Sequence, residues 1–97
     1  MRCAQTIAAE AVKDLDRLPA IVRAKLRDGL QTYLRHQPEK PSRSRIKRLR
    51  KLSQPQYRLR VDDVRIFYDV IDNRVEVLAI VPKTEAATWL GQFGKVE

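Results

Sequence analysis

The clearest pattern in the chain is an alternation of two sets of side chains over residues 57–70, which read YRLRVDDVRIFYDV. A period of two is typical of β-strands, in which successive side chains point to opposite faces. Asp62 and Asp63 interrupt the alternation, so we expect a hairpin with these residues as its turn. In that register Arg60 lies directly opposite Arg65. Because like charges that face each other destabilise a strand pair, the pattern indicates that this face of the sheet binds something anionic.

The alternation continues in a strand over residues 74–81, after a turn at Asp72 and Asn73. This strand is apolar on both faces, which is typical of a central strand. Weaker patterns predict short strands over 2–7 and 46–49. One face of the resulting sheet is apolar and consists of Tyr57, Leu59, Ile66, Tyr68, Val75 and Val77. The opposite face is expected to carry Arg58, Arg60, Arg65, Phe67, Leu78 and Ile80.

Two helices are predicted before the hairpin, from Ala8 to a break at Pro19 and over residues 20–36. Apolar residues of the second helix form one stripe, although Gly29 within it lowers its helix propensity. A short C-terminal helix or turn is expected over residues 83–90. The order β-α-α-β-β-β-α predicts an α+β fold, with two helices packed on one face of a small antiparallel sheet. We expect residues 1–97 to form a single domain.

The charge of the chain narrows the range of partners. Twenty Lys and Arg residues against 12 Asp and Glu residues give a net charge of +8, which favours nucleic acid or an acidic protein. The longest apolar run, residues 77–81, is too short to span a bilayer, and we expect no membrane partner. The N-terminus lacks the apolar core of a signal peptide, and Cys3 is the only cysteine. These features predict a cytoplasmic protein without disulfides.

Basic residues concentrate between residues 42 and 61, where there is no acidic residue. They are Arg43, Arg45, Lys47, Arg48, Arg50, Lys51, Arg58 and Arg60. Clustered arginines beside Phe67 suit a phosphate backbone with an adjacent base. An alternative is that the basic residues only keep the edge of the sheet from pairing with other chains. No metal-ligand cluster is visible and His36 is typical of a helix C-terminal cation, so we expect no metal or other cofactor.

Residues 47–90, KRLRKLSQPQYRLRVDDVRIFYDVIDNRVEVLAIVPKTEAATWL, resemble the RelE/ParE superfamily of toxins from type II toxin–antitoxin systems. Residues 11–26, AVKDLDRLPAIVRAKL, resemble the N-terminal helical signature of the same superfamily. The resemblance covers nearly the whole chain. It implies the RelE-like fold and a cognate antitoxin protein as partner, bound in a toxin–antitoxin hetero-oligomer.

The resemblance to the RelE-like branch implies an mRNA interferase, a ribosome-dependent endonuclease that inhibits translation by cutting mRNA in the A site. The ribose 2′-hydroxyl attacks the adjacent phosphate, without a metal. By position in the family pattern, the catalytic residues are Arg58, Arg60 and Arg65, which suit charge stabilisation. From the basic stretch and the residues near the C-terminus, we expect RNA contacts at Arg43, Arg45, Lys47, Arg48, Arg50, Lys51, Lys83 and Trp89. The ribosome and mRNA are then the expected partners.

The chain departs from the RelE-like pattern near its C-terminus. Such nucleases commonly carry an Arg after the last strand and a Tyr or His near the end, where this chain has Lys83 and Trp89. Arginine, with a pKa above about 12, is a poor proton shuttle at neutral pH. These departures favour an alternative: a ParE-like protein that poisons DNA gyrase by binding alone. A third hypothesis is an inactive member that is kept as a binding module.

Overall fold

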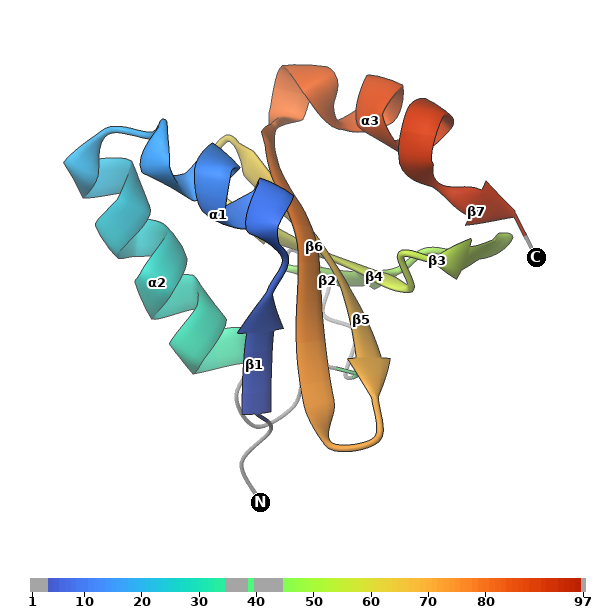
Figure 1. Cartoon of the computed structure of the whole chain (residues 1–97). Coiled ribbons are helices and arrows are strands. Elements are labelled where there is room, and N and C mark those ends of the chain that lie inside the picture. The colour runs from blue at the N-terminus through green and yellow to red at the C-terminus, as the bar shows by residue number, and fades with distance from the viewer. Residues whose placement is uncertain (1–3, 35–38, 40–44, 97) are drawn as a thin grey trace.

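The computed structural model describes residues 4–34, 39 and 45–96. Figure 1 shows its elements in chain order. They are β1 (Ala4–Ile7), α1 (Ala9–Asp16), α2 (Ala20–Leu34), β2 (Ile46–Arg48), β3 (Leu52–Gln54), β4 (Tyr57–Val61), β5 (Val64–Ile71), β6 (Arg74–Pro82), a 3₁₀ turn (Lys83–Glu85), α3 (Ala86–Phe93) and β7 (Lys95–Val96). Cys3 and His36 lie outside the described residues, as does the predicted start of the first strand.

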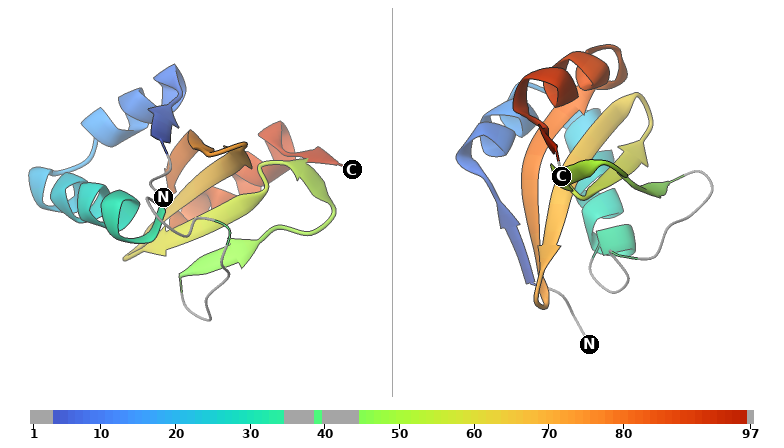
Figure 2. Two further views of the ribbon diagram at one scale, coloured as in Figure 1. Left: turned by 90° about the horizontal axis from the view of Figure 1, so that it is seen from below. Right: turned by 90° about the vertical axis from the view of Figure 1, so that its right-hand side faces the viewer.

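A five-stranded sheet in the order β1-β6-β5-β4-β2 forms the centre of the fold. The α1–α2 hairpin lies on one side of this sheet and α3 on the other (Figure 2). The predicted α+β class is confirmed, with two helices after the first strand and a short helix after the last strand of the main sheet, and β6 is central, between β1 and β5. The predicted order had three strands between the second and third helices, whereas the structure has β2 to β6 there. Pairing is antiparallel except for β1, which runs parallel to β6. The sequence patterns did not indicate β3 and β7, which pair as a separate two-stranded sheet.

The hairpin register is the one that the alternation predicts. Arg60 pairs with Arg65, and Val61 with Val64, so that Asp62 and Asp63 form the turn. Asp62 adopts a left-handed backbone conformation with a φ of 51°. Aspartate tolerates this conformation better than most residues with a side chain. The turn therefore places every side chain of β4 and β5 on a defined face.

The helices cover the apolar face, and the predicted core residues are buried there. Tyr57, Leu59, Ile66, Tyr68, Val75 and Val77 belong to one cluster with Leu26, Leu30 and Leu34 of α2. Gly29 explains how closely α2 approaches the sheet, because a Cβ at this position would lie 2.8 Å from Cγ2 of Val61. A residue that lowers helix propensity thus permits close packing of helix and strand.

The opposite face differs from the prediction because β6 contains a bulge. Phe67 pairs with Ala79 whereas Tyr68 pairs with Val77, so Leu78 is an extra residue in β6. A bulge of one residue reverses the alternation beyond it. Ile80 therefore pairs with Ile66 in the helix-covered core, and its predicted place on the arginine face was wrong.

Ala79 and Val81, instead of Ile80, lie on the arginine-bearing face of the sheet. They form a second apolar cluster there with Phe67. Trp89 and Leu90 of α3 pack on this cluster, together with Leu49 and Ala86. The rings of Trp89 and Phe67 stack with their centroids 4.9 Å apart and their planes 6° apart. Helix α3 thus covers part of the arginine-bearing face through Trp89, Leu90 and Ala86.

The junction between β3 and β4 is held by a buried carboxylate. Asp69 of β5 is 4% exposed and accepts hydrogen bonds from Gln54 Nε2 (2.9 Å) and from the backbone N–H of Gln56 (2.8 Å). Gln56 Oε1 accepts a bond from the backbone N–H of Val70 (2.9 Å). These contacts satisfy a buried charge and fix β3, on which β7 pairs.

We predict that Gly29→Ala destabilises the protein by about 1 kcal/mol. The gain in helix propensity, about 1 kcal/mol, is smaller than the cost of overpacking against Val61, about 1–3 kcal/mol. Urea unfolding measures the difference. Gly91→Ala in α3 is the matched control, because a Cβ there meets no atom within 4 Å. The control should be neutral or stabilised, and equal effects of the two substitutions would contradict the packing argument.

Candidate nucleic-acid interface

Four cationic residues lie side by side on the face of the sheet that the α1–α2 hairpin leaves open. Lys47 of β2 pairs with Arg58 of β4, and Arg60 of β4 pairs with Arg65 of β5. Directly paired residues project to the same face, and Arg58 pairs in turn with Phe67. We call Lys47, Arg58, Arg60 and Arg65 the cationic face. It combines clustered positive charge with an adjoining apolar floor.

Arg58 is the central and least satisfied member of the cationic face. Its Nε atom is buried and has no hydrogen-bond partner among the described residues. Burial, followed by the positive charges of Arg65 and Arg60, lowers the pKa of Arg58 below its ordinary value. A buried donor without a partner and neighbours of like charge both raise the free energy of the unliganded site. A phosphate or carboxylate beside the guanidinium would offset the repulsion between these like charges.

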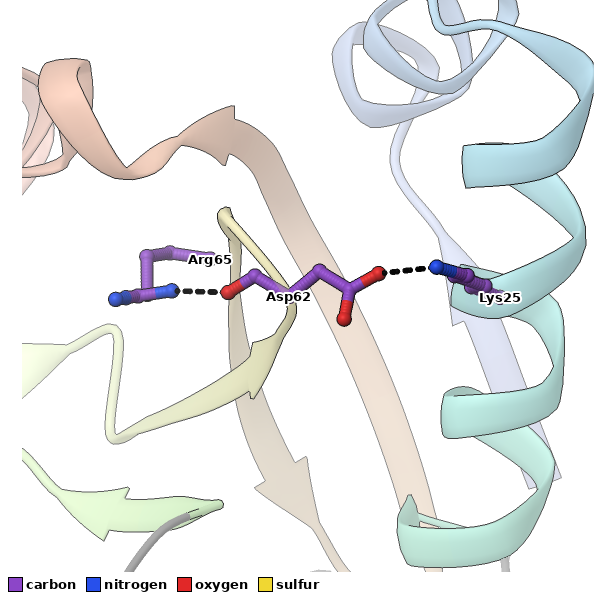
Figure 3. Close-up of polar contacts among 3 residues, drawn as sticks. All are labelled: Lys25, Asp62 and Arg65. Atoms are coloured by element: carbon purple, nitrogen blue, oxygen red, sulfur yellow. Dashed lines mark hydrogen bonds and ion pairs between the residues drawn. The ribbon is translucent and has the colours of Figure 1, made fainter.

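Arg65 is buried and bound to the hairpin turn. Its Nη1 donates to the backbone oxygens of Asp62 (3.1 Å) and Val64 (3.3 Å). The carboxylate of Asp62 points to the other side of the sheet, where it pairs with Lys25 of α2 at 3.0 Å (Figure 3). The turn thus contacts α2 through its side chain and Arg65 through its backbone. Arg65 therefore supplies a fixed positive charge behind Arg58, whereas Arg60 is exposed.

Several of the other basic residues are engaged within the fold. Arg48 Nη1 donates to the backbone oxygens of Leu49 and Gln56, both at 2.8 Å, and its guanidinium lies 5.3 Å from the ring centre of Tyr57. The guanidinium of Arg45 lies 5.4 Å from the ring centre of Tyr33. Arg48 in particular stabilises the connection between β2 and β4, so an RNA contact there would compete with internal bonds.

The remaining predicted RNA contacts are spread around the cationic face. Arg50 and Lys51 are exposed on the turn between β2 and β3, and Arg43 lies outside the described residues. Lys83 is exposed at the hairpin end of the sheet, where its backbone N–H donates to the oxygen of Asp63 (2.7 Å). Phe67 stacks on one face of the Trp89 ring. Lys47 pairs in register with Arg58 of the predicted catalytic set, and the backbone oxygen of Arg45 accepts a hydrogen bond from the backbone N–H of Arg60 (2.9 Å).

The tyrosines of the hairpin lie away from the cationic face. Tyr57 and Tyr68 stack on the core side with ring centroids 5.4 Å apart, as predicted for core aromatics. Burial raises the pKa of Tyr68 above its ordinary value, so its hydroxyl stays protonated at neutral pH. Among the described residues there is no group of three or more potential metal ligands. No described helix has the length and apolar character needed to cross a membrane.

We predict that Arg65→Ala destabilises the protein by about 1–2 kcal/mol, because it removes two hydrogen bonds and buried packing. Arg60→Ala should change stability by less than about 0.5 kcal/mol, since Arg60 is exposed. If the repulsion between the paired arginines were the only effect, both variants would be more stable than the wild type. Thermal and urea unfolding compare them, and a stabilised Arg65→Ala variant would show that the bonds to the turn are unimportant.

We predict that Tyr68 makes the fold sensitive to alkali. Its pKa is raised in the folded state, so its stabilising contribution is present below the unfolded value, about 10, and is lost as the pH rises above it. From this group the free energy of unfolding should fall by about 1.4 kcal/mol in total between pH 9 and 11, because the limiting slope of about 1.4 kcal/mol per pH unit is reached only above the unfolded pKa. Urea unfolding between pH 9 and 11 measures the slope. Tyr68→Phe should have a shallower slope, and parallel slopes would contradict the assignment.

The sequence of the chain matches a known protein family. Residues 6–86 match the family described as "ParE toxin of type II toxin-antitoxin system, parDE". No curated protein matches the chain.

Solved structures share the fold. The toxin-antitoxin complex RelBE2 from Mycobacterium tuberculosis matches with a TM-score of 0.71 and 21% identity over 84% of this chain and 99% of the other. The archaeal RelE–RelB complex from Pyrococcus horikoshii matches with a TM-score of 0.65 and 25% identity. The match covers 86% of this chain and 97% of the other. The isolated E. coli RelE toxin matches with a TM-score of 0.62 and 18% identity. The match covers 91% of this chain and 98% of the other.

Proposed function

The chain belongs to the ParE toxin family of type II toxin–antitoxin systems, within the RelE/ParE superfamily, and we propose that it inhibits translation by cutting mRNA on the ribosome. The observation that carries this proposal is Arg58, whose buried Nε has no hydrogen-bond partner among the described residues and whose pKa is lowered by burial and by the charges of Arg65 and Arg60. It lies between Lys47 and Phe67 in the sheet. An RNA phosphate can bond to such a guanidinium while a base contacts the apolar floor.

The ion pairs among the described residues support an anionic ligand. They join Lys13 to Glu10 and Lys25 to Asp62, and neither includes a member of the cationic face. Asp69, the buried carboxylate of β5, is bonded to Gln54 and Gln56 instead. The positive charge of the face is therefore available to a polyanion, and counterion release on binding would make the affinity salt-dependent.

In the proposed reaction, the ribose 2′-oxygen forms a bond to the adjacent phosphorus and the bond from phosphorus to the 5′-oxygen breaks. The 2′-hydroxyl loses a proton, the departing 5′-oxygen gains one, and the product is a 2′,3′-cyclic phosphate. Arg58 and Arg60 stabilise the additional negative charge on the phosphorane oxygens. Arg65, held on the turn, raises the positive potential behind them. The ribosome supplies the alignment of the reacting atoms, an effect that can be worth several kcal/mol.

Poisoning of DNA gyrase is the second candidate function. It is favoured by the side chains of the cationic face, which are all Lys or Arg and so transfer protons poorly at neutral pH. Binding without chemistry needs no proton transfer. In that case, the same face would bind an acidic surface of gyrase or its DNA.

A cognate antitoxin is the second partner that we propose. Two of the similar solved structures are complexes of a toxin with its antitoxin. The net charge of +8 and the unneutralised cationic face favour an acidic antitoxin. We propose that the complex forms in the cytoplasm, where the ribosomes are.

We predict that the purified protein cuts mRNA at the A-site codon of programmed ribosomes without added metal. Arg58→Ala and Arg60→Ala should each slow the single-turnover rate by about 10²-fold, the usual effect of removing one donor to a developing anion. Arg50→Ala is the control, because Arg50 is exposed and lies outside the paired strands of the cationic face. It should change only the salt dependence of binding, which a titration at several salt concentrations measures.

The same preparation tests the alternative. Intact mRNA at saturating protein, together with arrested supercoiling by gyrase, would overturn the nuclease proposal and support the gyrase poison.

A further inference from the structure

A groove of about 600 Å³ lies between α1 and α3, over the bulged part of β6. Figure 1 shows these two helices on either side of the end of β6. The residues lining the groove are Glu10, Asp14, Gln54, Pro55, Leu78, Ala79, Val81, Trp89 and Phe93. Most of this lining is apolar, and its volume lies within the range of ligand-binding pockets, about 300–1,000 Å³. We call this feature the α1–α3 groove.

The charge of the α1–α3 groove is opposite to that of the cationic face. Its charged lining residues are Glu10 and Asp14, which lie four residues apart and so on one side of α1. Glu10 makes only a loose pair with Lys13, 3.8 Å long, and its side chain is 82% exposed. None of the lining residues is basic, in a chain of net charge +8. An RNA phosphate would be repelled here, whereas a cation would be attracted.

The apolar wall of the groove extends to the surface. Phe93 is 59% exposed, and its ring lies against Trp89 with a centroid distance of 5.6 Å. Exposed aromatic surface beside a pocket is typical of positions that a protein partner buries. Trp89 is also stacked on Phe67, the neighbour of Arg58 in the sheet. Its ring therefore contacts both the groove and the floor of the cationic face.

We propose that the α1–α3 groove binds an apolar peptide segment of a partner protein that carries a lysine or arginine. Apolar side chains of the segment pack on Leu78, Ala79 and Phe93, and its cation pairs with Glu10 and Asp14. A nucleic acid does not fit the acidic rim, and an anionic lipid headgroup is excluded by the same charges. The proposal goes beyond the nuclease function and does not depend on it, because no residue of the cationic face lines the groove.

The test is a selection of random displayed peptides on the immobilised full-length protein. Peptides that combine large apolar residues with Lys or Arg should be enriched. Glu10→Lys/Asp14→Lys should weaken their binding by at least about fivefold, as expected for two lost exposed ion pairs and the added repulsion. Asp16→Lys/Asp28→Lys is the matched control, with the same change in net charge at exposed helical positions outside the groove.

Tryptophan fluorescence gives a second readout, because Trp89 is the only tryptophan of the chain. Synthetic versions of the selected peptides should shift its emission, and the shift should be lost in the Glu10→Lys/Asp14→Lys variant but kept in the control. Enrichment of acidic peptides alone, bound through Arg58 and Arg60, would overturn the proposal, as would no enrichment at all. Equal loss of binding in the groove variant and its control would show a net-charge effect and would also overturn it. Cleavage of mRNA is assayed separately, so a failure here leaves the proposed function untouched.

Discussion

The two-residue turn at Asp62 and Asp63 is the constraint on which the rest of the structure depends. It pairs Arg60 with Arg65 and Leu59 with Ile66, and a slip of one residue would move the arginines into the core. The turn also contacts both sides of the sheet, since Asp62 pairs with Lys25 of α2 and accepts a hydrogen bond from Arg65. The repulsion between the paired arginines is thereby tolerated, because Arg65 is bound to backbone oxygens while Arg60 extends into solvent.

The bulge at Leu78 is the second constraint, because it determines what lies beside the arginines. It returns Ile80 to the core and brings Ala79 and Val81 to the open face. These small and medium-sized side chains leave room for α3, and the contact of Trp89 with Phe67 follows from that room. The α1–α3 groove borders the same part of β6. One inserted residue thus accounts for the second cluster and for the floor of the groove.

The surface of this small toxin carries two regions of opposite charge, which meet at the contact between Trp89 and Phe67. The cationic face carries clustered positive charge and attracts anions, while the groove has an apolar lining and an acidic rim. Trp89 touches both regions through Phe67 and through Phe93. The two proposed ligands, a partner segment and an RNA strand, would therefore occupy neighbouring but chemically distinct sites.

The sequence by itself determined the local structure: the turn residues, the strand periodicity and the helical stripe all depend on near neighbours in the chain. For this reason the hairpin register, the buried face and the cationic residues of β4 and β5 could be predicted. The bulge could not, because the continuous apolar run of β6 fits either face equally well. Only the tertiary structure decided how the basic side chains are used. Arg48 and Arg65 are directed to backbone oxygens, whereas Lys47 and Arg60 remain on the open face, because the direction of a long side chain depends on the acceptors that folding brings near it.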